Sequence, residues 1–252
     1  IKEPSGKILL IDTGYPETEQ QLIRWFKEQG VDEIDHLIST HPHGDHLGCA
    51  VALLMRFRVN HLWDNGQKID HFEKGLTQQM AQNYEKHFRG HPAYNVLKAG
   101  DKIKCGEITL KVLWPRDTVR YDDWNTNSLV IMLSFKELKV LLAADFNQRG
   151  EKQLLKQEGR DLEADVLKIG HHGSGDASSP EFLQAVSPRW AVISVGDNPW
   201  GHPCRQVMRR LEDFPIRVFR TDRDGTIVFR YFPPQDIAIY PRNASPLLTR
   251  LR

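Results

Sequence analysis

The chain has 252 residues, of which 40% are hydrophobic and 27% are charged, and its formal net charge is +1. These values are typical of a globular protein that can bury a substantial core, and they exclude a globally basic nucleic-acid-binding protein. No apolar run approaches the ~20 residues that cross a bilayer, and no signal peptide is visible. The first residues resemble the second half of a hairpin, so a leader, a further strand or membrane segments could precede them in a longer protein.

The first half of the chain alternates apolar runs with segments of helical spacing. Residues 6–14 predict a buried strand followed by a turn, and residues 34–40 predict a second buried strand. Helices are predicted at residues 16–30, 45–57 and 71–90. This order is strand, helix, strand, helix, with polar residues at both strand ends.

The second half continues with strands and helices mixed. Residues 100–115 predict two antiparallel strands and residues 128–145 predict a hairpin. Further strands are predicted at 164–174, 189–196, 216–222 and 225–232, the last two as a terminal pair, and helices at 149–159, 179–186 and 202–214. This pattern predicts two sheets with helices outside. Residues 1–240 are expected to form one domain, and residues 241–252 a loose tail.

Polar side chains that can bind metals follow several of the predicted strands. Asp12, residues 41–46, Asp145 and the pair His171 and His172 all occupy such positions. Loop residues at strand ends can converge on one edge of a sheet, as they do in other α/β sites. We therefore expect these side chains to form one site.

The densest group is the segment "THPHGDH", which places His41, His43, Asp45 and His46 within six positions. His41 and His43 alternate and can share a direction, whereas Asp45 and His46 begin a helix that turns them elsewhere, so the segment can serve two adjacent ions. Imidazole and carboxylate ligands suit Zn, Mn or Fe. The cluster lacks a thiolate, and the chain has no CxxC pair, which favours an open catalytic site over a structural zinc site.

This HxHxDH segment resembles the ligand motif of the metallo-β-lactamase superfamily. The segments "LLIDTG" and "LLAAD" resemble two further strand ends of that superfamily. The segments "NTNSLVIML", "LKIGHHGS", "AVISVGDNPWGHP" and "RTDRDGTI" are similar to the hydrolase domain of the competence protein ComEC and its stand-alone relatives. The resemblance extends from Gly6 to about Phe229 and implies an α/β fold, the αββα sandwich of two mixed β-sheets with helices outside.

The resemblance also implies roles for individual residues. His41 and His43 are expected to bind one metal ion and Asp45 and His46 a second, with Asp145 bridging the two ions. One histidine of the following pair completes the second site: His172 is favoured, and His171 is then left to contact substrate or to orient a ligand. Asp12 is expected to support the ligand loop rather than to bind metal.

His202 and Ser174 carry less defined expectations. His202, beside a predicted helix start, could protonate a leaving group or hold a phosphate, and Ser174 could contact a phosphate.

Many superfamily members have a further histidine before the bridging aspartate, and here His61, His71, His87 and His91 lie in the predicted helical region, too early for that position. Asn125, Asn127 or a water would have to replace it, which weakens the first site and allows Mn²⁺ in place of Zn²⁺.

Two bound divalent ions would activate a hydroxide, and neither a GxSxG nor a P-loop motif is present, so hydrolysis is the expected reaction class. The ComEC-like pattern favours a phosphodiesterase or nuclease acting on DNA, including single-stranded DNA. An acyl-bond hydrolase (β-lactamase, lactonase or thioesterase type) and a non-catalytic metal-binding module of a DNA-uptake channel remain alternatives. As a ComEC domain, the chain would be attached to the bacterial cell membrane.

Basic residues that could contact a nucleic-acid backbone are Arg56, Arg58, Lys68, Arg116, Arg149, Arg205, Arg209 and Arg210.

Overall fold

The structure is a computed structural model that describes residues 1–72, 75–116, 121–158, 162–232 and 236–241. The chain divides into two compact units, Ile1–Leu129 and Val130–Arg252. The expectation of one domain over residues 1–240 stays a prediction. The expected tail falls almost entirely on residues 242–252, which lie outside the described residues.

The first unit contains a four-stranded parallel sheet with strand order β1-β2-β3-β4. Its strands are β1 (Leu9–Ile11), β2 (Glu33–Ile38), β3 (Arg58–Asp64) and β4 (Tyr94–Val96). Leu37 of β2 is in register with Leu10 of β1 on one side and with Leu62 of β3 on the other. The two buried strands predicted in this region correspond to β1 and β2, whereas β3 was not predicted.

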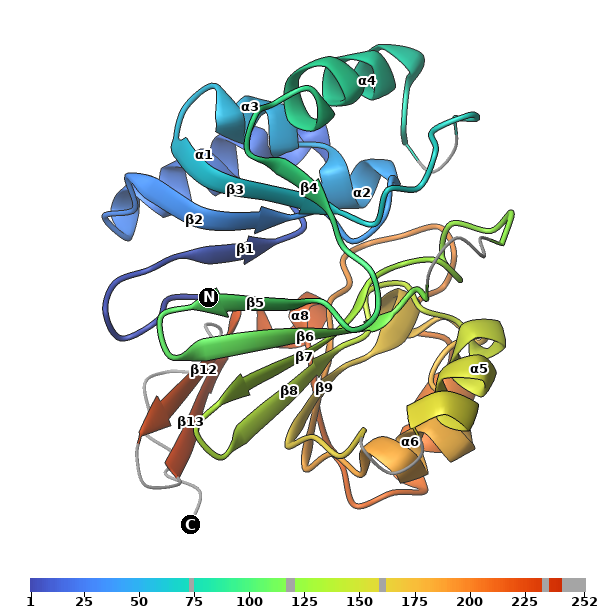
Figure 1. The fold of residues 1–252 in the computed structure, drawn as a ribbon. Coiled ribbons are helices and arrows are strands. Elements are labelled where there is room, and N and C mark those ends of the chain that lie inside the picture. The colour runs from blue at the N-terminus through green and yellow to red at the C-terminus, as the bar shows by residue number, and fades with distance from the viewer. Residues whose placement is uncertain (73–74, 117–120, 159–161, 233–235, 242–252) are drawn as a thin grey trace. The chain divides into compact units, whose positions relative to one another are not determined.

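The helical elements of the first unit are η1 (Pro16–Thr18), α1 (Glu19–Glu28), α2 (Gly44–Leu47), α3 (Ala50–Leu54), α4 (Gln78–Asn83) and η2 (Tyr84–Arg89). Figure 1 shows α1 and α3 over one face of the parallel sheet. Phe26 of α1 and Leu53 of α3 share a buried core with Leu37 and Leu62 of the sheet, so this face is closed by apolar packing. The first unit also contains the antiparallel hairpin of β5 (Lys102–Cys105) and β6 (Ile108–Trp114), as predicted.

The helix predicted at residues 45–57 is broken into α2 and α3. The His46 carbonyl accepts hydrogen bonds from the backbone N–H and the hydroxyl of Thr13, at 2.7 and 2.9 Å. The Thr13 hydroxyl oxygen in turn accepts from the Cys49 N–H at 3.1 Å. A Cβ on Gly48 would lie 2.5 Å from the Gly14 carbonyl oxygen, so the β1 turn approaches the helix at a residue without a side chain. The turn after β1 therefore takes over backbone groups that a continuous helix would use.

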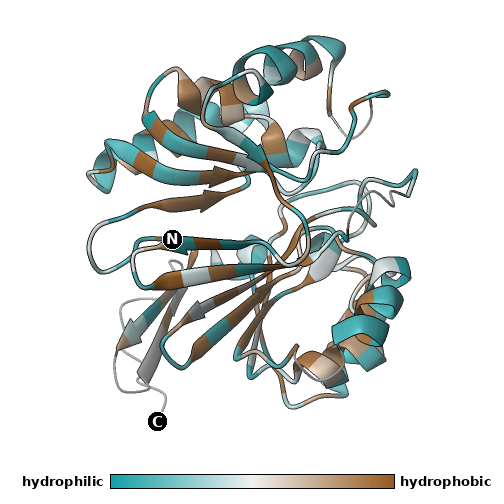
Figure 2. Ribbon diagram, in the orientation of Figure 1, coloured by the Kyte–Doolittle hydropathy of each residue, from teal (hydrophilic) through white to brown (hydrophobic). Residues whose placement is uncertain are grey.

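The second unit contains five strands that are adjacent in the order β7-β8-β9-β10-β11. They are β7 (Val130–Phe135), β8 (Leu138–Leu142), β9 (Val166–Lys168), β10 (Trp190–Ile193) and β11 (Arg217–Arg220). β7 and β8 form the predicted antiparallel hairpin, and the other three neighbouring pairs are parallel. Figure 2 shows that β7 is largely hydrophobic whereas α5 (Gln148–Glu158) is hydrophilic over much of its surface.

The predicted terminal strand pair is wrong. β11 pairs in parallel with β10, and β12 (Ile227–Phe232) pairs instead with β13 (Asp236–Pro241) in a two-stranded antiparallel sheet. The short helix α8 (Thr221–Asp224) separates β11 from β12, so the two strands are not joined by a hairpin turn. Phe219 of β11 and Phe229 of β12 nevertheless share one apolar cluster with Trp190.

The remaining helices of the second unit are η3 (Gly170–Gly173), α6 (Pro180–Val186) and α7 (Arg205–Glu212). The predicted cap of α6 is present, since the Ser179 hydroxyl accepts a hydrogen bond from the Phe182 N–H at 3.2 Å. Among the helices of the described ranges, none has the length and apolar character that a membrane crossing requires.

Candidate metal centre

The ligand loop of the first unit connects the end of β2 to α2. It buries three imidazoles, because His41, His43 and His46 are each at most 4% exposed. His41 Nε2 lies 2.8 Å from His43 Nδ1, and the ring centroids of His41 and His46 are 4.0 Å apart. Asp45 Oδ2 lies 3.6 Å from His46 Nε2. Four residues with metal-ligand side chains are therefore gathered within one short, mostly buried loop.

Asp12 holds this loop from the end of β1. It adopts a left-handed backbone conformation (φ 59°), which turns its carboxylate toward the loop. The carboxylate accepts hydrogen bonds from the N–H and the hydroxyl of Thr40, at 2.8 and 2.9 Å, and its Oδ2 lies 2.7 Å from His46 Nδ1. A proton on Nδ1 satisfies the carboxylate and leaves the lone pair of the neutral ring on Nε2, the atom that faces Asp45. Asp12 therefore contacts the ligand loop at Thr40 and His46, and its supporting role stays a prediction.

The second unit carries its own cluster around Asp145, which is 1% exposed and follows the end of β8. His171 and His172 follow the end of β9, and both have positive φ angles, of 46° and 53°. This backbone turns both rings toward Asp145: His171 Nε2 lies 3.8 Å from Asp145 Oδ2, and His172 Nε2 lies 3.4 Å from Asp145 Oδ1. Left-handed backbone at two successive non-glycine residues is costly and is often found at functional sites.

The partners of Nδ1 define how each of these two rings is presented. His172 Nδ1 lies 2.7 Å from the Ser194 carbonyl oxygen, which can only accept, so Nδ1 carries the proton and Nε2 is left with its lone pair. His171 Nδ1 faces the Asp176 carboxylate at 3.3 Å. The hydrogen bond from His171 lowers the pKa of Asp176 to about 2. Carbonyl and carboxylate partners both fix the orientation of an imidazole, as the Asp12 carboxylate does for His46.

His202 and Ser174 lie beside this cluster. The ring centroid of His202 is 5.6 Å from that of His171, and burial, followed by the charges of His171 and His172, lowers the pKa of His202. Asn198 fixes the backbone of His202 by accepting from its N–H and donating to its carbonyl, both at 2.9 Å. The Ser174 N–H donates to the His171 carbonyl at 2.8 Å, so Ser174 belongs to the turn that holds the histidine pair.

The two asparagines lie in a tightly bonded loop of the first unit. The side chain of Asn127 donates to the Tyr121 carbonyl at 2.6 Å and accepts from the Tyr121 N–H at 3.0 Å, which closes the loop between them. Asn125 is 5% exposed, and its carbonyl accepts from the Ser128 hydroxyl at 2.9 Å. Asn127 thus uses both ends of its amide to hold the backbone, whereas the metal role expected for either asparagine stays a prediction.

The expectation that four histidines lie in a helical region is wrong for three of them. His61 belongs to β3, and His71 and His91 lie outside any helix. His71 packs against Trp124 at a centroid distance of 4.0 Å, and Trp124 packs in turn against His43 at 5.3 Å. A contact between residues 53 positions apart leaves no local pattern, so no sequence signal could have revealed it.

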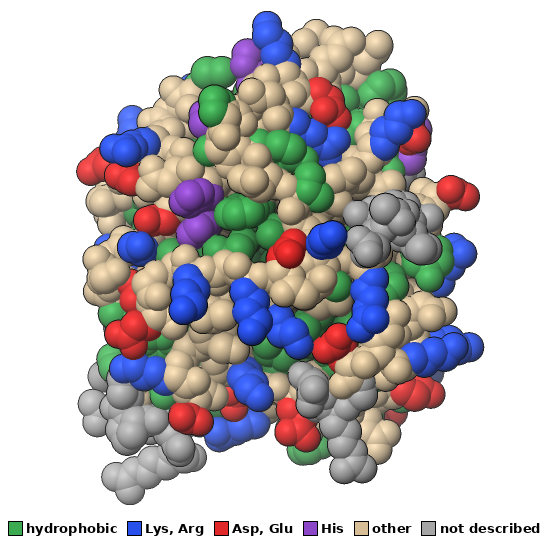
Figure 3. All heavy atoms as spheres, in the orientation of Figure 1, with side chains coloured by type: hydrophobic (Ala, Val, Ile, Leu, Met, Phe, Trp, Pro, Cys, Tyr) green, Lys and Arg blue, Asp and Glu red, His purple; other side chains and the backbone are tan. Residues whose placement is uncertain are grey.

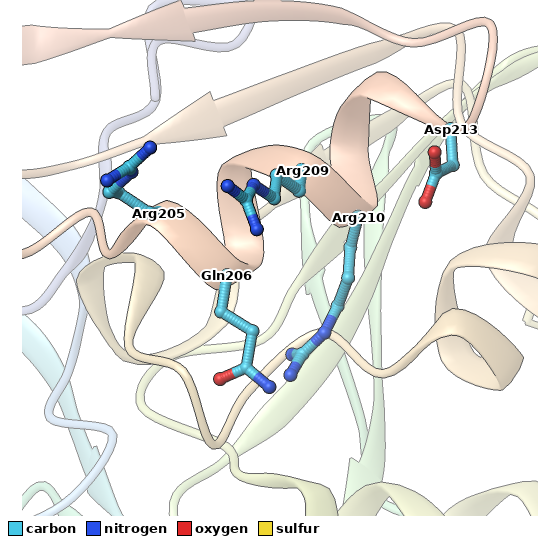
Figure 4. Close-up of a pocket in the computed structure, with 5 residues that line it drawn as sticks. All are labelled: Arg205, Gln206, Arg209, Arg210 and Asp213. Atoms are coloured by element: carbon cyan, nitrogen blue, oxygen red, sulfur yellow. The ribbon is translucent and has the colours of Figure 1, made fainter.

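Three of the eight candidate basic residues lie together on one helix, α7. Arg205, Arg209 and Arg210 line a hollow of about 430 Å³ on α7, together with Gln206 and Asp213 (Figure 4). In contrast, the charges on the face drawn in Figure 3 are mixed, with Asp and Glu side chains between the Lys and Arg side chains. This mixture agrees with the small net charge and leaves α7 as a local basic surface.

The family model of the metallo-beta-lactamase superfamily matches residues 1–197, which include both clusters. The chain belongs to the metallo-β-lactamase superfamily. The expected α/β fold is confirmed: the metallo-beta-lactamase fold protein YhfI from Bacillus subtilis aligns over 85% of this chain and 84% of its own, with a TM-score of 0.52 at 15% identity. At that identity the likeness shows the fold alone.

The curated relatives of this metallo-β-lactamase superfamily chain include competence proteins, as the resemblance predicted. It is 31% identical to ComE operon protein 3 of Bacillus subtilis (86% of this chain, 28% of that protein) and 29% identical to competence protein ComA of Neisseria gonorrhoeae (89% and 29%). It is 28% identical to recombination protein 2 of Haemophilus influenzae (90% and 27%). The chain therefore spans less than a third of the length of these relatives.

Proposed function

We propose that this chain is a metal-dependent phosphodiesterase or nuclease that acts on DNA, single-stranded DNA included. The observation that carries the proposal is the pair of His/Asp clusters: in each unit an imidazole whose Nδ1 is already hydrogen-bonded presents its Nε2 to an aspartate carboxylate, His46 to Asp45 and His172 to Asp145. This arrangement fits metal ligands, because a ligating histidine commonly donates its other N–H to a carboxylate or carbonyl. The superfamily match runs through both clusters.

We assign the metal ligands as the resemblance implies. His41 and His43 hold one ion, Asp45, His46 and His172 hold the other, and Asp145 serves both. Two divalent ions, Zn²⁺ or Mn²⁺, would supply an activated water and neutralise the charge that develops on a phosphodiester.

The residues around these ligands have supporting tasks in the proposed reaction. Asp12 and Ser194 hold the ligand rings of His46 and His172 through Nδ1. His171 and His202 are the candidates for proton transfer to the leaving oxygen, since their rings neighbour each other and the ring of His171 faces Asp145. Ser174 keeps the histidine turn in place and is a candidate phosphate contact.

DNA is favoured as the substrate on two grounds. Two of the relatives at about 30% identity are a competence protein and a recombination protein by name. In addition, Arg205 and Arg209 lie on α7, which begins three residues after His202, and both side chains are exposed. Their positive charges can bind the phosphate groups of a DNA backbone. A role of the longer parent protein in DNA uptake at the bacterial membrane is part of the same proposal.

A substrate panel tests this function. The metal-loaded chain is incubated with bis(p-nitrophenyl) phosphate, single-stranded DNA and nitrocefin, each with Mn²⁺ and with Zn²⁺. Hydrolysis of the first two substrates is expected. Turnover of nitrocefin alone would identify an acyl-bond hydrolase, and metal binding without any turnover would identify a non-catalytic module.

The support from Asp12 leads to a prediction on metal affinity. The change Asp12→Asn keeps the shape of the side chain but removes the carboxylate that orients His46, so the metal dissociation constant is expected to rise about 10–100-fold. Asp35→Asn is the matched control, because Asp35 also accepts a hydrogen bond from a neighbouring backbone group, the Ile8 N–H at 2.8 Å, and within the described part of the chain it has no hydrogen bond to the ligand loop. Competition with a chromophoric chelator measures both affinities, and equal values for the two variants would remove Asp12 from the site.

The basic surface of α7 leads to a prediction on salt dependence. The double change Arg205→Ala/Arg209→Ala removes two exposed charges, so the slope of log affinity for single-stranded DNA against log salt concentration is expected to flatten by about 1.4. Arg24→Ala/Lys27→Ala on α1 removes the same charge from another exposed helix and should leave the slope unchanged. Fluorescence anisotropy of a labelled oligonucleotide measures the slope, and equal flattening by both variants would show that α7 has no specific part in binding.

A further inference from the structure

The segment Ser174–Ser179 connects the histidine pair to α6, and its backbone is held by side chains from two helices. We call this segment the clasped loop. Arg210 of α7 donates to the carbonyls of Gly175 and Ala177, both at 2.9 Å. The backbone N–H of Gln148, at the start of α5, donates to the Asp176 carbonyl at 2.6 Å. Three consecutive carbonyls of the clasped loop are therefore engaged from outside it.

Glu151 of α5 engages the other end of the clasped loop. Its two carboxylate oxygens accept hydrogen bonds from successive backbone groups, the Ser178 N–H at 2.5 Å and the Ser179 N–H at 2.8 Å. Ser178 has a left-handed backbone (φ 54°), so the carboxylate stabilises a conformation that serine rarely adopts. The two bonds fix the direction in which the loop leaves the histidine pair.

The environment of Glu151 shows how unusual this carboxylate is. Glu151 is 1% exposed, and burial raises its pKa to about 7, while the hydrogen bonds and the charge of Arg210 act in the opposite direction. A carboxylate is costly to bury unless hydrogen bonds compensate for the lost water. The only partners recorded for Glu151 in the described ranges, apart from its own helix, belong to the clasped loop and Arg210.

Asp176 connects the clasped loop to the Asp145 cluster through His171. Asp176 has an exposed carboxylate, and this carboxylate lies 3.3 Å from His171 Nδ1, whose Nε2 faces Asp145. Arg210 binds the carbonyls of the residues before and after Asp176, and Glu151 binds the N–H groups of Ser178 and Ser179. The position of Asp176 therefore depends on a backbone that is held on both sides.

We infer that Glu151 is a positioning residue: by holding the clasped loop it places Asp176 against His171 and so fixes the orientation of the His171 ring. The use of His171 in hydrolysis rests on the proposed function, but the positioning does not. The inference predicts that loss of Glu151 and loss of Asp176 have the same effect on His171, and that the two losses do not add.

Nuclear magnetic resonance of the metal-free full chain tests the positioning without any substrate. The imidazole signals of His171 are compared in wild type, Glu151→Gln, Asp176→Asn and the double variant. Glu151→Gln is expected to move the His171 signals in the direction that Asp176→Asn moves them, and the double variant should match Asp176→Asn. Unchanged His171 signals in Glu151→Gln, with shifted amide signals of Ser178 and Ser179, would overturn the inference.

Two further variants keep the test decisive. Glu181→Gln removes an exposed carboxylate from the first turn of α6, next to the clasped loop, and should leave His171 unchanged. If Glu151→Gln does not fold, Arg210→Met releases the carbonyls of Gly175 and Ala177 from the other side and should move the same His171 signals. A folded Arg210→Met chain with wild-type His171 signals would contradict the inference.

Kinetics add a second readout once hydrolysis is established. Glu151→Gln and Asp176→Asn should each lower kcat about 3–10-fold with little change in KM, and the double variant should fall no further. Multiplying effects would mean that Glu151 acts independently of Asp176, which would contradict the inference. If wild type hydrolyses nothing, the proposed function fails while the magnetic resonance result still decides the role of Glu151.

Discussion

Asp145→Asn is expected to lower kcat/KM for a phosphodiester by on the order of 10³-fold or more, the loss typical of removing a group that acts directly in the reaction. Asparagine preserves the size of the side chain but removes the negative charge that would hold both ions. The carboxylate is almost fully buried between His171 and His172, so no neighbouring water can easily take its place. Initial rates with bis(p-nitrophenyl) phosphate over a range of Mn²⁺ concentrations measure the loss.

The matched control for this change is Asp165→Asn. Asp165 belongs to the same unit and caps a strand by accepting from the Lys139 N–H at 2.9 Å, without a recorded contact to the histidines in the described ranges. Its replacement should cost stability but keep the rate within a few-fold of wild type. Full activity of Asp145→Asn, with the fold intact by circular dichroism, would rule out the proposed role of Asp145.

Asp64→Ala is expected to lower the free energy of unfolding of the first unit by about 3–5 kcal/mol, because it removes the buried charge partner of the largely buried Arg89 guanidinium, which keeps its ion pair with the more exposed Glu85. Asp64 is 2% exposed and accepts from Arg89 Nε at 2.7 Å, from the Tyr94 hydroxyl at 2.8 Å and from the Tyr84 hydroxyl at 3.2 Å. The same carboxylate accepts from the Gly66 N–H at 2.7 Å, so the turn after β3 depends on it as well.

Urea unfolding of this variant, followed by backbone amide exchange in β2 and β3, measures the loss in the first unit separately from the second. Asp32→Ala, at an exposed aspartate of the same unit, is the control and should change the free energy by less than about 0.5 kcal/mol. A change of that small size for Asp64→Ala would mean that the network around Arg89 contributes little to stability.

Local sequence patterns predicted the parts of the site that local structure creates. The HxHxDH loop and the positions of Asp12 and Asp145 follow directly from apolar runs that end in polar residues, and the structure places each of them just beyond a strand. The hairpin of β7 and β8 and the Ser179 cap were predictable for the same reason. In each case the signal lies within about ten residues of the structure that it specifies.

Contacts between distant residues account for what was missed. The helix after the ligand loop is broken by Thr13, more than thirty positions earlier, and β11 finds its partner in β10 rather than in the next strand. The packing of His71 on Trp124 arises in the same way. Asp176 had a weak local signal, because it is an acidic residue shortly after a histidine pair. The hydrogen bonds from Ser178 and Ser179 to Glu151 join residues 27 and 28 positions apart, so no local pattern predicts them.

The most direct test of the account is the number of metal ions bound by wild type, His43→Ala and Asp145→Asn, measured by elemental analysis after reconstitution with Mn²⁺ or Zn²⁺. We expect up to two ions per wild-type chain and weaker binding after either change, because the proposed ligand sets draw on both clusters. Wild-type protein that retains no Mn²⁺ or Zn²⁺, or an Asp145→Asn variant that binds as many ions as tightly as wild type, would contradict it.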